Sequence, residues 1–274
     1  MKKIFAAFIL VLAAVTPVCA ATYSASGRVP TVGAQLLTKN GFSASNVKFT
    51  VVKGATDNSN FLSDGIVYVS QAKLKYAGND NEVAAVVGNE LGHIIAGHAA
   101  KGRIIDHFAG GTQNKVSNAI AKKDQDIADL ASAAVVTFRS SKNEKEADLI
   151  ATNLMVNANY NPLALIVVLT KQTGTYWDSV QGKPSNADRA MNTYNYVSYV
   201  YPAKVKAGYG CNEYRNFLTY ANKIVKARNA SPKLKKANEK LVKAQKTKIA
   251  KKIDNYKVRG GLSIWDAVSG FAGS

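Results

Sequence analysis

One stretch constrains the fold of this 274-residue chain more than any other: residues 82–100, which read EVAAVVGNELGHIIAGHAA. The polar and acidic residues 80–82 at its start are typical of a helix N-terminus, where they cap free N–H groups and favour the positive end of the dipole. We therefore expect a helix over about residues 82–100. Because this helix is largely apolar, its polar residues Asn89, Glu90 and His93 are the candidates for metal binding or catalysis.

These three residues nearly match the His-Glu-x-x-His motif. In that motif two histidines four residues apart bind zinc from one helix face, and the glutamate takes a proton from the metal-bound water. Here Asn89 replaces the first histidine and offers only a neutral amide oxygen, while His98 would lie about 140° around a continuous helix from His93. For this stretch alone, a surface pair of Glu90 and His93 is the simpler explanation.

The rest of the chain predicts an α+β fold that is mostly helical. Two β-branched and aromatic runs, NVKFTVVKG and GIVYVSQ, favour strands, and a short helix ended by Gly41 comes before them. Helical periodicity recurs over residues 124–138, 143–158, 162–174, 187–201 and 212–229. We expect a small sheet beside a helical domain over residues 29–200, followed by a helical extension over residues 203–274.

Further motifs follow the central helix in order. NEKEAD places Glu144 and Asp148 four residues apart, NYNP follows at residues 159–162, and KPSNADRA contains Arg189. Together with VGAQLLTKNGF, VKFTVVKG and NSNFLSDGIVYVS upstream, the order resembles zinc metallopeptidase family forty-eight. This gluzincin family includes the membrane protease HtpX, the CAAX prenyl proteases and soluble periplasmic relatives, and the resemblance runs from about residue 29 to residue 200.

The resemblance implies a zincin-like domain with zinc as cofactor, and it implies a role for each matching residue. Glu90 matches the general base, and His93 and Glu144 match two zinc ligands. Asp148 matches the carboxylate that orients a ligating histidine. Arg189 matches the basic group that stabilises the oxyanion of the tetrahedral intermediate.

Two positions differ from the family pattern. Asn89 stands at the first zinc-ligand position, and Lys183 stands where relatives carry a further histidine near the metal. Losing one of three ligands should remove most of the affinity for zinc. We hypothesise that Lys183 supplies the positive charge that converging carboxylates require; the alternative is that it is a solvent-exposed loop residue.

The N-terminus predicts export. Residues 1–20 combine Lys2 and Lys3 with a short apolar run and small residues, which is typical of a secretory signal peptide. The run is too short for a spanning helix, and no later stretch is long enough, so we expect a periplasmic or secreted protein without a transmembrane segment. Cys211 is then the only cysteine, so no internal disulfide can form.

The net charge of +18 is concentrated near the C-terminus, where residues 203–259 hold seventeen Lys or Arg against three acidic residues. A stripe of Leu234, Ala237, Leu241 and Ala244 continues to residues 249–256, which predicts a basic helix docked on the domain by that stripe. Attraction to anionic envelope surfaces is the functional alternative. Binding to nucleic acid would suit the positive charge of this region but not an exported protein.

Three functions remain open from the sequence. The resemblance implies a zinc-dependent endopeptidase that acts on envelope proteins or peptides. Asn89 leaves catalysis in question, so the second is a pseudopeptidase that binds unfolded or extended polypeptide along the NSNFLSD segment without cleaving it. The third is an envelope-binding module that acts through residues 203–259.

Overall fold

The computed structural model describes residues 23–53, 65–98, 141–172 and 186–258. In chain order these contain α1 (Ala25–Thr38), β1 (Lys48–Val52), β2 (Ile66–Ser70), α3 (Gln71–Leu74), α4 (Asp80–Ile95), α7 (Ser141–Asn157), α8 (Leu163–Lys171), α10 (Asn186–Val200), α11 (Pro202–Ala207), α12 (Asn212–Asn229) and α13 (Pro232–Val258). The predicted α+β fold, mostly helical with a small sheet, is confirmed. The signal sequence, the helix predicted over residues 124–138, and Lys183 lie outside the described residues.

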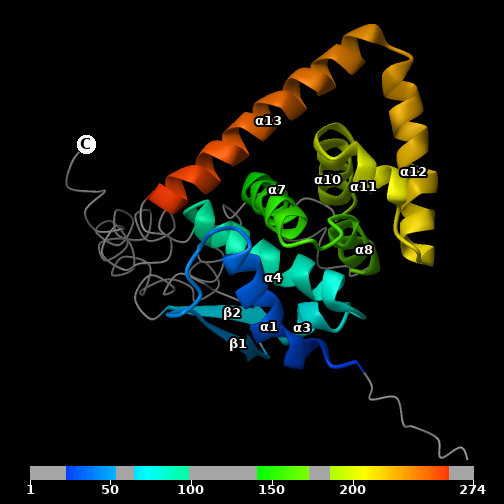
Figure 1. The fold of residues 1–274 in the computed structure, drawn as a ribbon. Helices are drawn as coiled ribbons and strands as arrows, with labels where there is room; N and C mark the ends of the chain where they lie inside the picture. Colours follow the sequence, from blue (N-terminus) through cyan, green and yellow to red (C-terminus); the bar gives the residue numbers. More distant parts are fainter. Residues whose placement is uncertain (1–22, 54–64, 99–140, 173–185, 259–274) are drawn as a thin grey trace, which may run out of the picture.

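Helix α4 is the centre of the fold, with α1, α7 and α8 packed around it (Figure 1). Its N-cap is Asn79, whose side chain accepts a hydrogen bond from the backbone N–H of Glu82. All its residues from Glu82 to Ile95 are buried except His93, which is partly exposed. A helix that is buried on every side needs an apolar sequence, and this explains the composition of the stretch.

The central helix is shorter than the sequence predicts. It ends at Ile95, and Gly97 follows with a φ of 69°, a left-handed conformation that glycine adopts without strain. His98 is therefore not on the continuation of the α4 surface. The expected offset of about 140° from His93 is wrong, because it assumed an unbroken helix.

The two strands lie beside α1 and α4 and pair in parallel, with Lys48 opposite Ile66 and Val52 opposite Ser70. Val67 and Val69 of β2 are fully buried. Ser70 ends β2, and α3 begins at the next residue. This short helix brings the side chain of Lys73 to α4.

Helices α4 and α7 approach closely because glycines on α4 face alanines on α7. A Cβ at Gly92 would lie 2.4 Å from the carbonyl oxygen of Ala147, and one at Gly88 would lie 3.2 Å from the Cβ of Ala151. Residues four apart share a helix face, so the two glycines form one contact surface. The same contact brings the polar residues of the two helices together.

Helices α12 and α13 extend from the domain as two arms of a V (Figure 1), with α12 packed on α8 and α13 packed on α10 and α7. The predicted apolar stripe of α13 is wrong in its first half, since Leu234 and Leu241 are 54% and 55% exposed. Val242, Ile249 and Ile253 are buried instead. The contact therefore begins at Val242, and the residues of α13 before it are mostly exposed. No helix in the described parts of the chain is long and apolar enough to cross a membrane.

Candidate functional site

The candidate site lies where α4, α7 and α10 meet. Helix α4 contributes Asn89 and His93, α7 contributes Glu144 and Asp148, and α10 contributes Arg189. On each of α4 and α7 the two residues are four apart, so both pairs lie on the faces that meet at the glycine–alanine contact. The structure thus brings together five of the residues selected from the sequence.

Glu144 lies between two basic side chains. Its Oε1 is 3.4 Å from Nε2 of His93, and its Oε2 is 3.0 Å from a terminal nitrogen of Arg189. Burial opposes ionisation of this carboxyl, but the Arg189 charge and the hydrogen bond from His93 outweigh it, so the pKa of Glu144 is well below its ordinary value. Glu144 is therefore a carboxylate at neutral pH.

Asp148 is fully buried and fixed by two partners. Arg189 donates from Nε to Oδ2 at 2.8 Å and from a terminal nitrogen to Oδ1 at 2.7 Å, which is a bidentate ion pair. Asn89, which is itself 4% exposed, donates from Nδ2 to Oδ1 at 2.8 Å. The amide at the first ligand position thus serves as a hydrogen-bond donor to a buried carboxylate.

Glu90 forms an ion pair that the sequence analysis missed. Nζ of Lys73 lies 2.7 Å from Oε1 of this buried glutamate. Burial tends to lower the pKa of Lys73, but the charges of Glu90 and Glu144 outweigh it and raise the pKa above its ordinary value. Lys73 is therefore a stable cation directly against the predicted general base. The sequence shows Lys73 three residues after the end of β2 and shortly before α4. Its spacing does not indicate which acidic residue it contacts.

A second chain of polar contacts leads from His93 to the C-terminal extension. Nδ1 of His98 is 3.1 Å from Nδ1 of His93, and Nε2 of His98 is 3.0 Å from Glu146. Lys248 and Lys252 of α13 each place an ammonium group 2.7 Å from the same Glu146 carboxylate. Burial opposes ionisation of Glu146, yet the hydrogen bonds from His98 and the two lysines outweigh it and lower its pKa.

Burial also lowers the pKa of His98, which favours its neutral form. No sequence pattern connects His98, Glu146 and α13, because the contact depends on the turn at Gly97 and on the position of α13. The other residue expected near the site, Lys183, lies outside the described residues. Its proposed pairing with the carboxylates stays a prediction.

A small cavity of about 20 Å³ lies beside the site, lined by the polar residues Lys73, Asn89, Gln172 and Arg189 and by apolar residues of α4 and α8. That volume holds about one water molecule, and the polar side chains can supply its hydrogen bonds. No larger substrate group fits in it.

A buried helix with a glutamate and a histidine three residues on, contacting a second helix with two carboxylates, defines a metallopeptidase-like protein. The model of Peptidase family M48 matches residues 24–202, which is more than half of the chain. The chain belongs to this family. The match ends where α11 begins, so α12 and α13 lie beyond it.

One relative is Metalloprotease LoiP of Escherichia coli (strain K12), which is 25% identical over 167 residues. The matched region covers 56% of this chain and 64% of LoiP, so the chain spans slightly less than two thirds of that relative. No solved structure matches the chain.

The family makes zinc the expected metal, and zinc requires a particular set of donors. Ligands about 2.0–2.1 Å from one tetrahedral ion lie roughly 3.3 Å apart, and His93 Nε2 and Glu144 Oε1 have this spacing at 3.4 Å. A catalytic site needs a third protein ligand, and Asn89 instead directs its NH₂ group to Asp148. The described residues contain no group of three His, Cys, Asp or Glu side chains that could hold a metal ion. They provide two donors of a set of three, which does not fit a complete zinc centre.

Proposed function

We propose that this chain is a metallopeptidase-family protein that binds polypeptide without cleaving it. The observation that carries the proposal is the contact of Asn89 with Asp148, in which the residue at the first ligand position donates a hydrogen bond into a buried ion pair. An amide that points its NH₂ group at a carboxylate is stable without a metal. Each carboxylate of the centre thus has a cationic partner within the protein, Arg189 for Glu144 and Asp148 and Lys73 for Glu90.

The environment of Glu90 supports the same conclusion. A general base must have a free lone pair within reach of the water that it deprotonates. One oxygen of Glu90 instead accepts a hydrogen bond from Nζ of Lys73 at 2.7 Å, so that oxygen already has a partner within the protein.

Polypeptide is the proposed ligand because the family consists of peptidases and LoiP is named a metalloprotease. Glu90, His93, Glu144, Asp148 and Arg189 lie together where α3, α4, α7 and α10 meet, which supports a peptidase-like site. An extended segment would be held by addition of its backbone to a strand edge, which recognises polypeptide with little regard to sequence. The NSNFLSD segment expected to take part lies outside the described residues.

The test compares the natural protein with Asn89→His, and uses Asn229→His as a matched control with an added histidine on an exposed helix end. Zinc per chain is measured by elemental analysis after dialysis against trace zinc. Binding of a permanently unfolded, fluorescently labelled protein is measured by anisotropy, and its cleavage by electrophoresis. We expect the natural protein and Asn229→His to bind the unfolded protein, hold well under one zinc per chain and leave the client intact. Asn89→His should gain zinc.

A second candidate function, zinc-dependent endopeptidase action on envelope proteins, is favoured by the 3.4 Å spacing of His93 Nε2 and Glu144 Oε1. In that case the natural protein holds about one zinc per chain, cleaves the client, and loses cleavage but not zinc in Glu90→Gln. This result would overturn the pseudopeptidase proposal. Failure of every variant to bind the unfolded protein would overturn the polypeptide-binding part.

Export to the periplasm or to the medium, and attraction of residues 203–259 to anionic envelope surfaces, are part of the same proposal. They are supported by the N-terminal sequence pattern and by the many exposed lysines on α12 and α13. Truncation after Pro202 should abolish binding to phosphatidylglycerol vesicles. Undiminished binding of the truncated chain would contradict a role for the tail.

A further inference from the structure

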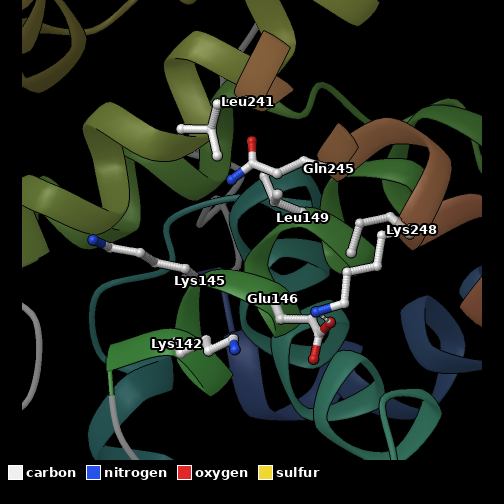
Figure 2. Close-up of a pocket in the computed structure, with 8 residues that line it drawn as sticks. Lys142, Lys145, Glu146, Leu149, Leu241, Gln245 and Lys248 are labelled. Carbon is white, nitrogen blue, oxygen red and sulfur yellow. Dashed lines mark ion pairs between the residues drawn. The ribbon is translucent and has the colours of Figure 1, made fainter. Parts of the chain in front are cut away.

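A pocket of about 430 Å³ lies between α7 and α13, apart from the candidate site (Figure 2). Lys142, Lys145, Glu146 and Leu149 line it from α7, and the facing residues of α13 are Leu241, Gln245, Lys248 and Ile249. Its volume is within the range of small-molecule sites in proteins. One of its two walls, α13, lies beyond the part of the chain that matches the family.

The surface inside this pocket is mostly apolar. Leu149 of α7 and Ile249 of α13 line it and are each 2% exposed. Leu241 also lines it and is 55% exposed, so the pocket includes a large apolar side chain that faces solvent. An apolar group that enters here would remove both its own surface and that of Leu241 from water.

The charges around the pocket are not balanced. Among the described residues, Lys142 and Lys145 form no ion pair with an acidic side chain. Lys248 pairs with Glu146, but Lys252 and His98 contact the same carboxylate, so one negative charge meets two ammonium groups. The lining thus carries three positive charges, on Lys142, Lys145 and Lys248, against the one negative charge of Glu146.

We propose that this α7–α13 pocket binds a single-chain anionic amphiphile, of the chemical class of a long-chain carboxylate. The acyl chain lies on Leu149, Leu241 and Ile249, and the negative headgroup lies among the ammonium groups of Lys142, Lys145 and Lys248. The positive charge of the lining favours an anion, and its apolar residues favour an anion with a hydrocarbon chain.

An acidic peptide suits the pocket less well. Extended peptides are held chiefly by backbone hydrogen bonds to an open strand edge. Both walls here are helices, whose N–H and C=O groups are bonded within each helix, so the pocket offers side chains alone.

The test measures binding of dodecanoate to the purified full chain by calorimetry, below the critical micelle concentration. Dodecyl maltoside and dodecyltrimethylammonium provide neutral and cationic probes with the same chain length. We expect one dodecanoate per chain, binding about tenfold weaker for the maltoside, and no binding of the cation.

Two double variants with the same change in net charge distinguish binding in the pocket from nonspecific attraction of the anion to a basic protein. Lys142→Glu with Lys145→Glu should weaken dodecanoate binding about tenfold or more. Lys235→Glu with Lys236→Glu, on the exposed first half of α13, should change it less than about twofold. Leu241→Gln should weaken it several-fold. These side chains are exposed or partly exposed, so folding is preserved and is checked by circular dichroism.

The proposal is overturned if dodecanoate does not bind, if the maltoside binds equally well, or if the two double variants lose affinity equally. Binding to phosphatidylglycerol vesicles without binding to monomeric dodecanoate would also overturn it, since that result assigns the charge to a membrane surface and not to the pocket.

Discussion

The charged residues of this protein occupy two contrasting environments, the α4–α7–α10 centre and the α12–α13 extension. In the centre the carboxylates of Glu90, Glu144 and Asp148 each have a cationic or histidine partner within 3.4 Å. In the extension most lysines point into solvent, and the described contacts to an acid are those of Lys248 and Lys252 with Glu146. Burial makes the difference, because an unpaired ion is costly in the interior and nearly free in water.

The largest effect should come from removing the cation of the centre. Among the described residues, Arg189→Met leaves the buried side chain of Asp148 with Asn89 as its remaining donor, and breaking a buried pair in this way costs about 3–5 kcal/mol of unfolding free energy. Urea unfolding followed by circular dichroism measures it. Arg215→Met, on an exposed face of α12, should change stability by less than about 0.5 kcal/mol. Equal losses in the two variants would remove the contrast between centre and extension.

The next effect concerns how the centre is assembled. Gly92→Ala adds a methyl group that would lie 2.4 Å from the Ala147 carbonyl oxygen, so α4 and α7 must separate, at a cost of about 1–3 kcal/mol. Gly210→Ala is the control, since a Cβ there meets nothing within 4 Å. The measurement is the thermal unfolding midpoint of each variant, which should fall for Gly92→Ala and stay unchanged for Gly210→Ala. An unchanged Gly92→Ala variant would show that the helices are not held at this distance.

The pH dependence should show the third effect. The pKa of Glu146 is below its ordinary value of 4.5 in the folded chain, so its ionisation stabilises the fold above that pH and this stability is lost as the pH falls toward the folded pKa. Each proton taken up on unfolding contributes at most about 1.4 kcal/mol per pH unit. Glu146→Gln should flatten the decline in unfolding free energy below pH 4.5. Glu239→Gln, on the exposed side of α13, is the control and should keep the natural slope.

The smallest effect tests the boundary between docked and solvated parts of α13. Ile253→Val deletes one methyl group from a side chain that is 7% exposed and should cost about 0.5–1.5 kcal/mol. Leu234→Ala removes more atoms but from a side chain that is 54% exposed, and should change stability by less than about 0.5 kcal/mol. The opposite ranking in urea unfolding would restore the apolar stripe predicted from the sequence.

Local spacing explains why so much of the site could be predicted. Asn89 and His93, and Glu144 and Asp148, are four residues apart, so a helix places each pair on one face whatever surrounds it. The order of the motifs then identified the family. The glycine–alanine contact between α4 and α7 was also readable from residues 88, 92, 147 and 151, but only when it was known which helices meet.

Other features could not be read from spacing. The turn at Gly97 ends α4 and returns His98 to His93, whereas an apolar run with one glycine is equally compatible with a longer helix. The partner of Glu90 is Lys73, one of many lysines in the chain. In α13, Leu241 and Val242 are adjacent and both apolar, yet the first is 55% exposed and the second 1%.

The sequence by itself determined the family, the mostly helical fold, the asparagine at the predicted first ligand position and the uneven distribution of charge, because each depends on residue identity and on spacing within one element. The tertiary structure decided which charges meet. Lys73 pairs with Glu90, Arg189 with Asp148 and Glu144, and α13 with Glu146, since ion pairs between elements form only where packing removes both partners from water.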